Sequence, residues 1–196
     1  RLEMRKILLV GRTSVGKSSY INTAFGKHVA RVSEYEACTK IVSYYAYKTD
    51  MGDIHLIDTP GLAEDDLVCD KKYLSLIKDN VDFEDIDVMV YVSRLDETRF
   101  RPDEKRTLKL LTEYLDVSLW QRAALLLTFS SFVRTHERDN VASVRANHIE
   151  GFLRSVTKEN SLEGQFRNFR SYWLVDNILG SSTLQQTPII DVGFFT

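Results

Sequence analysis

The sequence contains few residues of the types that build disulfide frameworks, linkers or membrane spans. Its two cysteines, Cys38 and Cys69, form no disulfide framework or metal-binding pattern, so we expect reduced thiols. With three prolines and no low-complexity stretch, it offers no candidate linker. No apolar run reaches the roughly 18 residues that a membrane helix requires. A formal net charge of −2 argues against a broad basic face and a nucleic-acid partner.

The hydrophobic residues are gathered in short runs that are typical of strands. These runs are residues 6–10, 41–48, 53–58, 87–92, 123–129 and 171–175. Several are near-continuous, as in parallel strands that are buried on both faces. Residues 41–48 and 53–58 flank the turn-like sequence TDMG, which predicts an antiparallel hairpin.

Helical patterns separate these runs. Residues 18–25 follow the first strand, a second apolar stripe follows Asp70, and Pro102 suits the start of a third helix. Asn140 is a plausible cap for a fourth helix. Its expected inward residues are Val141, Val144, Ile149, Phe152 and Val156. Strands that alternate with helices predict an α/β sandwich with a mostly parallel sheet.

Residues 11–18 read GRTSVGKS between a strand and a helical pattern, as the GxxxxGK[ST] phosphate loop requires. Its glycines let successive N–H groups point into one anion-sized hollow, and the helix start adds its positive end. Lys17 can approach the β- and γ-phosphates, and Ser18 can offer a hydroxyl to Mg²⁺. The alternative is a glycine-rich turn with a solvated lysine. Predicted nucleotide contacts here are Gly11, Arg12, Thr13, Ser14, Val15, Gly16, Lys17, Ser18 and Ser19.

Two later segments complete the predicted site. The run at 53–58 ends in Asp58-Thr59-Pro60-Gly61, where Asp58 can hold Mg²⁺ through water and the Gly61 N–H can reach the γ-phosphate. Thr39 is the candidate that reaches Mg²⁺ and the γ-phosphate from a mobile loop, unless it merely starts a strand. We therefore predict a three-layer P-loop NTPase sandwich with one antiparallel edge strand, and switch segments at 28–40 and 59–70. The nucleotide-binding domain is expected over residues 1–180, with 181–196 as an extension of unknown packing.

The order of these motifs resembles the translation-factor-related GTPases. A narrower likeness lies in DIDVMVYVSRLDETRF (85–100), WQRAALLLTFSSF (120–132) and WLVDN (173–177). These resemble the septin-related (paraseptin) branch that holds the Toc-type chloroplast import receptors and the AIG-type (GIMAP) G domains. The RLD at 94–96 together with Arg99 favours the Toc side.

This resemblance implies a homodimer, or a pair with a related GTPase, formed across the nucleotide sites. Arg99 would then approach the partner's nucleotide as a catalytic group beside Lys17 and Thr39. A guanidinium supplied in trans can neutralise charge on the transferring phosphate. The alternative is a surface arginine near acidic neighbours.

The guanine-reading [NT]KxD segment of most GTPases is replaced by Thr128-Phe129-Ser130-Ser131. Phe129 stands where Toc-like proteins usually have histidine, and it either stacks on the base or lies buried. The resemblance instead implies guanine contacts from Asp176 and Asn177. The Asp176 carboxylate would reject adenine because adenine leaves that carboxylate unpaired.

No glutamine follows Gly61, so we expect slow Mg²⁺-dependent GTP hydrolysis that dimerisation or a partner improves. The resemblance implies a switch that serves a membrane translocon or precursor protein. It would face the cytosol at the chloroplast outer envelope, held there by sequence outside this chain. The alternatives are a non-cycling, nucleotide-loaded scaffold, another AIG-type GTPase in the cytoplasm, and an ATPase.

Overall fold

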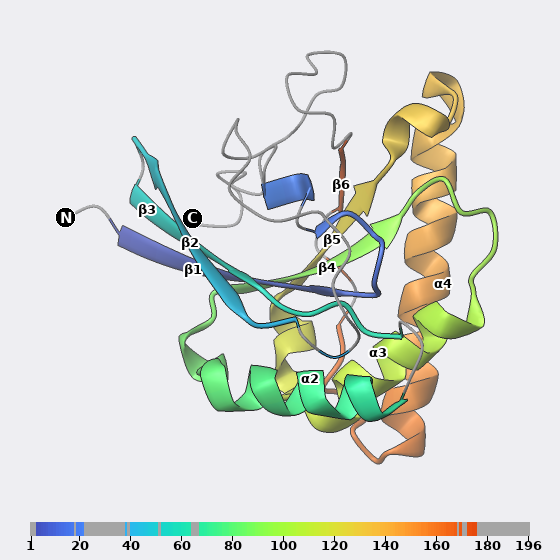
Figure 1. Ribbon diagram of the computed structural model, residues 1–196. Coiled ribbons are helices and arrows are strands. Elements are labelled where there is room, and N and C mark those ends of the chain that lie inside the picture. The colour runs from blue at the N-terminus through green and yellow to red at the C-terminus, as the bar shows by residue number, and fades with distance from the viewer. Residues whose placement is uncertain are drawn as a thin grey trace.

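A six-stranded sheet in the order β2-β3-β1-β4-β5-β6 forms the centre of the computed structural model (Figure 1). The structure describes residues 3–17, 19–21, 38, 40–50, 52–63, 67–167, 169 and 172–175. The strands are β1 (Glu3–Gly11), β2 (Ser43–Thr49), β3 (Gly52–Asp58), β4 (Val88–Arg94), β5 (Ala123–Thr128) and β6 (Tyr172–Leu174). All neighbours pair in parallel except the edge strand β2, which is antiparallel to β3. The predicted α/β fold with one antiparallel edge strand is confirmed.

Burial explains this arrangement of strands. Every residue of β5 is buried, and β4 is buried up to its last residue, so these strands lie inside the sheet. The edge strand β2 exposes Tyr44 (57%), whereas Tyr45 packs against the core. The turn between β2 and β3 places Gly52 at φ 136°, a conformation that favours glycine. The predicted hairpin is therefore present.

Three helices cover one face of the sheet. They are α2 (Leu67–Asn80), α3 (Pro102–Tyr114) and α4 (Arg138–Glu159). Figure 1 shows α2 and α3 below the sheet and α4 upright at the right. Buried Tyr73, Leu108 and Ile149 from these helices share one cluster with Leu8 and Leu125 of the sheet. The 3₁₀ turns are η1 (Phe83–Asp85), η2 (Val117–Arg122), η3 (Ser130–Phe132) and η4 (Thr135–Glu137). Every helix in the described part of the chain is too short or too polar to cross a membrane.

The start of α4 differs from its prediction, whereas Pro102 does begin α3. The turn η4 leads into α4 at Arg138, so Asn140 lies inside the helix and does not cap it. The buried stripe is also turned from the predicted one, and Val144 is 46% exposed. Arg145 is buried instead, because it pairs with a buried carboxylate on α3.

The opposite face of the sheet has its own cluster of buried residues. Ile7, Leu9 and Leu126 pack there with Tyr20 and Ile21, which follow the phosphate loop. Residues 17 and 19–21 are helical, in agreement with the predicted first helix. The remainder of that helix and the predicted extension 181–196 lie outside the described residues.

Cys38 and Cys69 form a disulfide, so the prediction of reduced thiols is wrong for this structure. The two residues are 31 positions apart, and their Cα atoms lie 5.0 Å apart. The β2–β3 hairpin lies between them and returns the chain to the same end of the sheet. Cysteine spacing alone does not contain that information, and a reducing compartment no longer follows from the cysteine count.

Candidate nucleotide site

The phosphate loop joins the end of β1 to a helix that starts at Lys17. Gly16 adopts φ 89°, and its carbonyl accepts the helical hydrogen bond from the Tyr20 N–H at 2.8 Å. A Cβ on Gly11 would lie 2.7 Å from the Val92 carbonyl oxygen, so this position has no room for a side chain. The strand–loop–helix geometry of a phosphate cradle is therefore present.

The segment after β3 lies directly against this loop. The Thr13 N–H donates to the Leu62 carbonyl at 2.8 Å, and the Leu62 N–H donates to the Gly11 carbonyl at 3.1 Å. A Cβ on Gly61 would come within 2.6 Å of the Thr13 Cα and 3.2 Å of the Lys17 Nζ. Gly61 therefore lies beside the phosphate-loop lysine, which is the juxtaposition that the two motifs predicted.

Asp58 ends β3 beside Leu9 of β1, at the carboxyl end of two parallel strands. Asp58 has interactions within the structure, but its Oδ1 oxygen is buried and makes no hydrogen bond with the described residues. A carboxylate at this depth beside a phosphate loop suits Mg²⁺ held through water. The other predicted Mg²⁺ ligands, Ser18 and Thr39, lie outside the described residues.

Arg12 has a role that the sequence did not indicate. Its side chain is only 8% exposed, and it donates to Glu97 at 2.6 Å and to Asp103 at 3.1 Å. Both acids lie beyond β4, near the predicted dimer arginine. The predicted nucleotide contact of Arg12 can therefore come from its backbone, while the guanidinium ties the phosphate loop to residues 97–103.

A second buried arginine, on α4, also holds this segment. Arg145 pairs with Glu104 at 3.0 Å, and its guanidinium also donates to the carbonyls of Glu97 and Arg99. The Glu104 carboxylate accepts from Ser93 at 2.5 Å and from Tyr91 at 3.2 Å. The one local signal in the sequence for this network is that Arg145 lies among the apolar residues that form the buried face of α4.

Burial raises the pKa of the Tyr91 phenol well above its usual range, and the Glu104 charge acts in the same direction. Tyr91 therefore stays protonated and remains a hydrogen-bond donor to Glu104.

Arg99 itself is exposed at the end of this segment. The acids expected near it are engaged elsewhere, because Asp96 pairs with Arg94 while Glu97 and Asp103 pair with Arg12. No ion pair of Arg99 is found within the described residues. Its backbone is held, and its guanidinium is presented at the surface.

The predicted base-binding end is assembled around β5. Thr128 is buried, and its hydroxyl donates to the Val15 carbonyl of the phosphate loop at 2.6 Å, so its side chain supports that loop. Phe129 adopts φ 56°, and the Arg94 guanidinium lies 3.9 Å from its ring centroid. One face of Phe129 is thus covered by an arginine, and the ring is only partly buried.

The predicted guanine readers Asp176 and Asn177 lie outside the described residues. Val175, however, is placed beside this end of the sheet. Its carbonyl accepts from the Ser130 N–H at 3.2 Å, and its N–H donates to the Leu127 carbonyl at 2.9 Å. Val175, the residue before the predicted readers in sequence, therefore lies next to the segment that replaces [NT]KxD.

Comparison with protein families gives a match over this region. A model described as 50S ribosome-binding GTPase matches residues 6–126, which include most of β1, all of β2 to β4, the phosphate loop and Asp58–Gly61. The chain belongs to this GTPase family. The prediction of a GTPase is thereby confirmed, while the predicted domain bounds, residues 1–180, stay a prediction.

Curated relatives of this GTPase include chloroplast translocases. Translocase of chloroplast 33 from Arabidopsis thaliana is 32% identical over 161 residues, covering 80% of this chain and 53% of the relative. GTP-binding protein A from Dictyostelium discoideum is 34% identical over 129 residues, covering 65% of this chain and 28% of the relative. The chain thus spans about half or less of these relatives' length.

Solved structures agree with this kinship. A crystal structure of Toc33 from Arabidopsis thaliana in complex with Mg²⁺ and GMPPNP has a TM-score of 0.74 and 27% identity. The match covers 92% of this GTPase and 74% of that chain. The crystal structure of Era with MgGDPNP and an RNA segment, at 16% identity and a TM-score of 0.61, supports the fold alone. Together the comparisons support a Toc-type GTPase domain.

Proposed function

We propose that this chain is the G domain of a guanine-nucleotide switch that hydrolyses GTP slowly with Mg²⁺ and faster when two domains pair. The observation that carries this proposal is the network through Arg12 and Arg145. It connects the phosphate loop to a backbone segment that presents Arg99 at the surface. An arginine presented in this way can reach a second nucleotide site only by contact with another protein.

The proposal also draws on two related structures. One is a dimerisation-deficient mutant of Toc33 in which an arginine is replaced by alanine. The other belongs to work on the translocon components Toc33 and Toc159, in which dimerisation is important for GTPase activity. By likeness to these proteins, we assign Arg99 as the arginine that acts across the dimer.

Slow intrinsic turnover follows from the residue after Gly61. Ras-like enzymes place a water-orienting glutamine in this loop. Here Leu62 is buried, and both its N–H and its carbonyl bond to the phosphate loop. The next N–H, of Ala63, donates to Asp70. This stretch therefore supports the loop and offers no polar side chain to an attacking water.

The proposed roles within one domain are as follows. Lys17 neutralises the β- and γ-phosphates, while Ser18, Thr39 and Asp58 hold Mg²⁺ directly or through water. Toc33 binds Mg²⁺ with GMPPNP and with GDP in its crystal structures, which supports the same ligands here. Asp176 and Asn177 read the guanine.

We further propose a protein-import receptor of the Toc type, facing the cytosol at the chloroplast outer envelope, with the translocon or a precursor protein as partner. The support is the set of translocase names among the relatives, from Arabidopsis thaliana to Chlamydomonas reinhardtii. Membership of the septin-related branch, shared with AIG-type G domains, belongs to the same proposal. Membrane attachment would depend on sequence outside this chain.

The test is the GTP hydrolysis rate per molecule as a function of protein concentration. We expect the wild-type rate to rise with concentration and Arg99→Ala to abolish that rise. Arg101→Ala is the matched control, because Arg101 is an exposed arginine two residues away. Rapid turnover that does not depend on concentration would contradict the proposal. Tightly held nucleotide with no turnover at any concentration would favour the non-cycling scaffold.

A further inference from the structure

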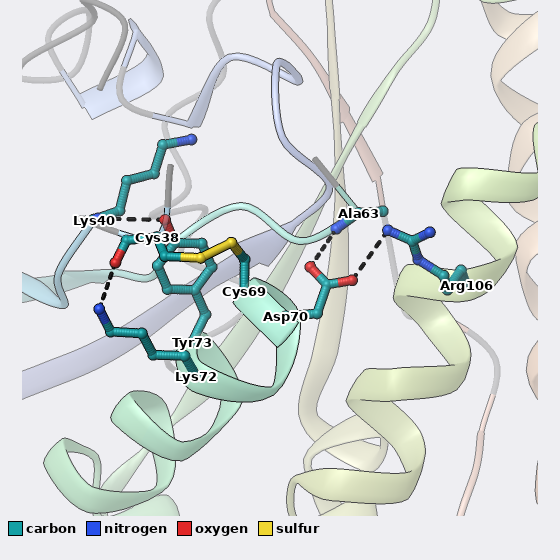
Figure 2. Close-up of a disulfide and its surroundings, with 8 residues drawn as sticks. All are labelled: Cys38, Lys40, Ala63, Cys69, Asp70, Lys72, Tyr73 and Arg106. Atoms are coloured by element: carbon teal, nitrogen blue, oxygen red, sulfur yellow. Dashed lines mark hydrogen bonds and ion pairs between the residues drawn. A yellow bond between two sulfur atoms is a disulfide. The ribbon is translucent and has the colours of Figure 1, made fainter. Parts of the chain in front are cut away.

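The disulfide between Cys38 and Cys69 joins two segments that flank the proposed γ-phosphate site (Figure 2). Cys38 immediately precedes Thr39, the candidate Mg²⁺ and γ-phosphate ligand. Cys69 lies in the first turn of α2, close after Asp58–Gly61. The bond therefore crosslinks the two predicted switch segments.

Hydrogen bonds reinforce this crosslink. The Lys72 Nζ donates to the Cys38 carbonyl at 2.6 Å, and the Lys40 N–H donates to the Tyr73 hydroxyl at 3.4 Å. The Lys40 Nζ reaches the Thr13 hydroxyl of the phosphate loop at 3.3 Å. Residues 38 and 40 are thus held between α2 and the phosphate loop, on either side of Thr39.

The α2 side of the crosslink is firmly anchored. Asp70, next to Cys69, is buried, accepts from the Ala63 N–H at 2.8 Å and pairs with Arg106 of α3 at 3.1 Å. Tyr73 is fully buried in the main core cluster. Figure 2 shows dashed lines from Asp70 to both Ala63 and Arg106, with the disulfide on the side of Asp70 away from Arg106. Movement of the crosslinked pair would therefore have to come from the Cys38 segment.

The Cys38 backbone shows that this segment is held in an unfavourable conformation. Cys38 adopts φ 62°, in the left-handed region that non-glycine residues rarely occupy. Such a conformation persists only where surrounding contacts enforce it. Breaking the covalent contact removes one of these restraints and leaves the hydrogen bonds and the packing of Cys38 against the core.

We propose that the Cys38–Cys69 disulfide is a redox-cleavable tether that slows nucleotide release in the oxidised protein. The mechanism rests on the proposed role of Thr39, because a ligand to Mg²⁺ and phosphate must move away before the nucleotide leaves. The tether keeps Cys38 and Lys40 between α2 and the phosphate loop, and reduction frees them.

The reductant is a dithiol, and the exchange is balanced. Cys38 is partly exposed whereas Cys69 is buried, so a reductant thiolate attacks the Cys38 sulfur. The Cys38–Cys69 bond breaks, and Cys69 leaves as a thiolate that takes up a proton. The second thiol of the reductant, as a thiolate, then attacks the reductant sulfur that is bonded to Cys38 in the mixed disulfide. Cys38 leaves and is protonated, and the reductant, now a disulfide, has supplied two electrons.

The test measures release of fluorescently labelled GMPPNP, which keeps a third phosphate group, with Mg²⁺ and excess unlabelled GMPPNP. Oxidised protein is compared with protein reduced with dithiothreitol. Thiols are counted in each sample by alkylation and mass spectrometry. We expect release to be about fivefold faster or more after reduction, because local opening of the freed segment precedes release. Cys38→Ser and Cys69→Ser should release at the reduced rate, with or without dithiothreitol.

Equal release rates in the two states, or two free thiols in the oxidised sample, would overturn the tether. Thr39→Ala with the disulfide intact tests the mechanism directly. Release should then be faster even in the oxidised protein, and an unchanged rate would overturn the mechanism through Thr39. If no guanine nucleotide binds at all, the proposed function fails. Tryptic cleavage after Lys40 then tests the tether, which requires faster cleavage after reduction.

Discussion

Replacing Arg145 with methionine tests the network that holds the Arg99 segment. The Arg145 and Glu104 side chains are 4% and 2% exposed, so this is a buried ion pair. Removing the arginine leaves the Glu104 carboxylate buried with two neutral donors, Ser93 and Tyr91. Breaking a buried pair from one side typically costs about 3–5 kcal/mol of unfolding free energy. The carbonyls of Glu97 and Arg99 also lose their donor.

The assay is urea unfolding followed by circular dichroism. Lys109→Met is the matched control, because Lys109 forms an exposed pair with Glu113 at 3.9 Å on the same helix as Glu104. We expect that control to cost at most about 0.5 kcal/mol. Arg145→Met combined with Glu104→Leu should recover part of the loss, because the buried charge is then gone.

A loss below about 1 kcal/mol for Arg145→Met would refute the reasoning, since it would place the pair in solvent-like surroundings. The same variant should also weaken the rise of GTPase rate with protein concentration. If the Arg145→Met variant stays folded and keeps its stability but its GTPase rate no longer rises with concentration, Arg145 only positions the Arg99 segment.

The remaining predictions concern three single substitutions. Burial raises the pKa of Tyr91, so the unfolded chain ionises this phenol above about pH 10 while the folded chain keeps it protonated. This contribution to stability is complete below that pH and is lost above it, so Tyr91→Phe should lose less stability than wild type between about pH 9 and pH 11 in urea titrations. Gly61→Ala would place a Cβ 2.6 Å from the Thr13 Cα and should abolish GDP binding in a fluorescence titration, whereas Gly151→Ala, whose Cβ meets nothing within 4 Å, should not. Asp176→Ala should lower the preference for GTP over ATP about tenfold or more in competition with labelled GDP, and unchanged selectivity would remove Asp176 as the guanine reader.

The parts of the molecule that could be predicted depend on local sequence. Residues 11–17 carry their geometry in fixed spacing, because glycine, lysine and helix start are adjacent in the chain. Buried parallel strands such as β4 and β5 are visible as uninterrupted apolar runs. Asp58–Gly61 was found because its motif ends a strand-like run and follows the phosphate loop in the expected order, and the structure places that strand beside β1.

The parts that were missed depend on contacts between distant residues. Arg12 and Glu97 are 85 positions apart, and Arg145 and Glu104 are 41 apart, so no local pattern connects them. A charged residue on an apolar face signals only that some partner exists. Ser18, Thr39, Asp176 and Asn177 lie outside the described residues, and their roles stay predictions.

Neighbouring residues of the phosphate loop connect the nucleotide site to two different surfaces. Arg12 bonds to the segment that presents Arg99, and Thr13 accepts from Lys40 beside the disulfide. A nucleotide that orders this loop would bias both segments at once. Because such coupling is reciprocal in free energy, a partner that favours one arrangement of the Arg99 segment must also favour the nucleotide that produces it. A tether on residues 38–40 acts on the same loop, so its oxidation state and the pairing of domains are expected to affect one another.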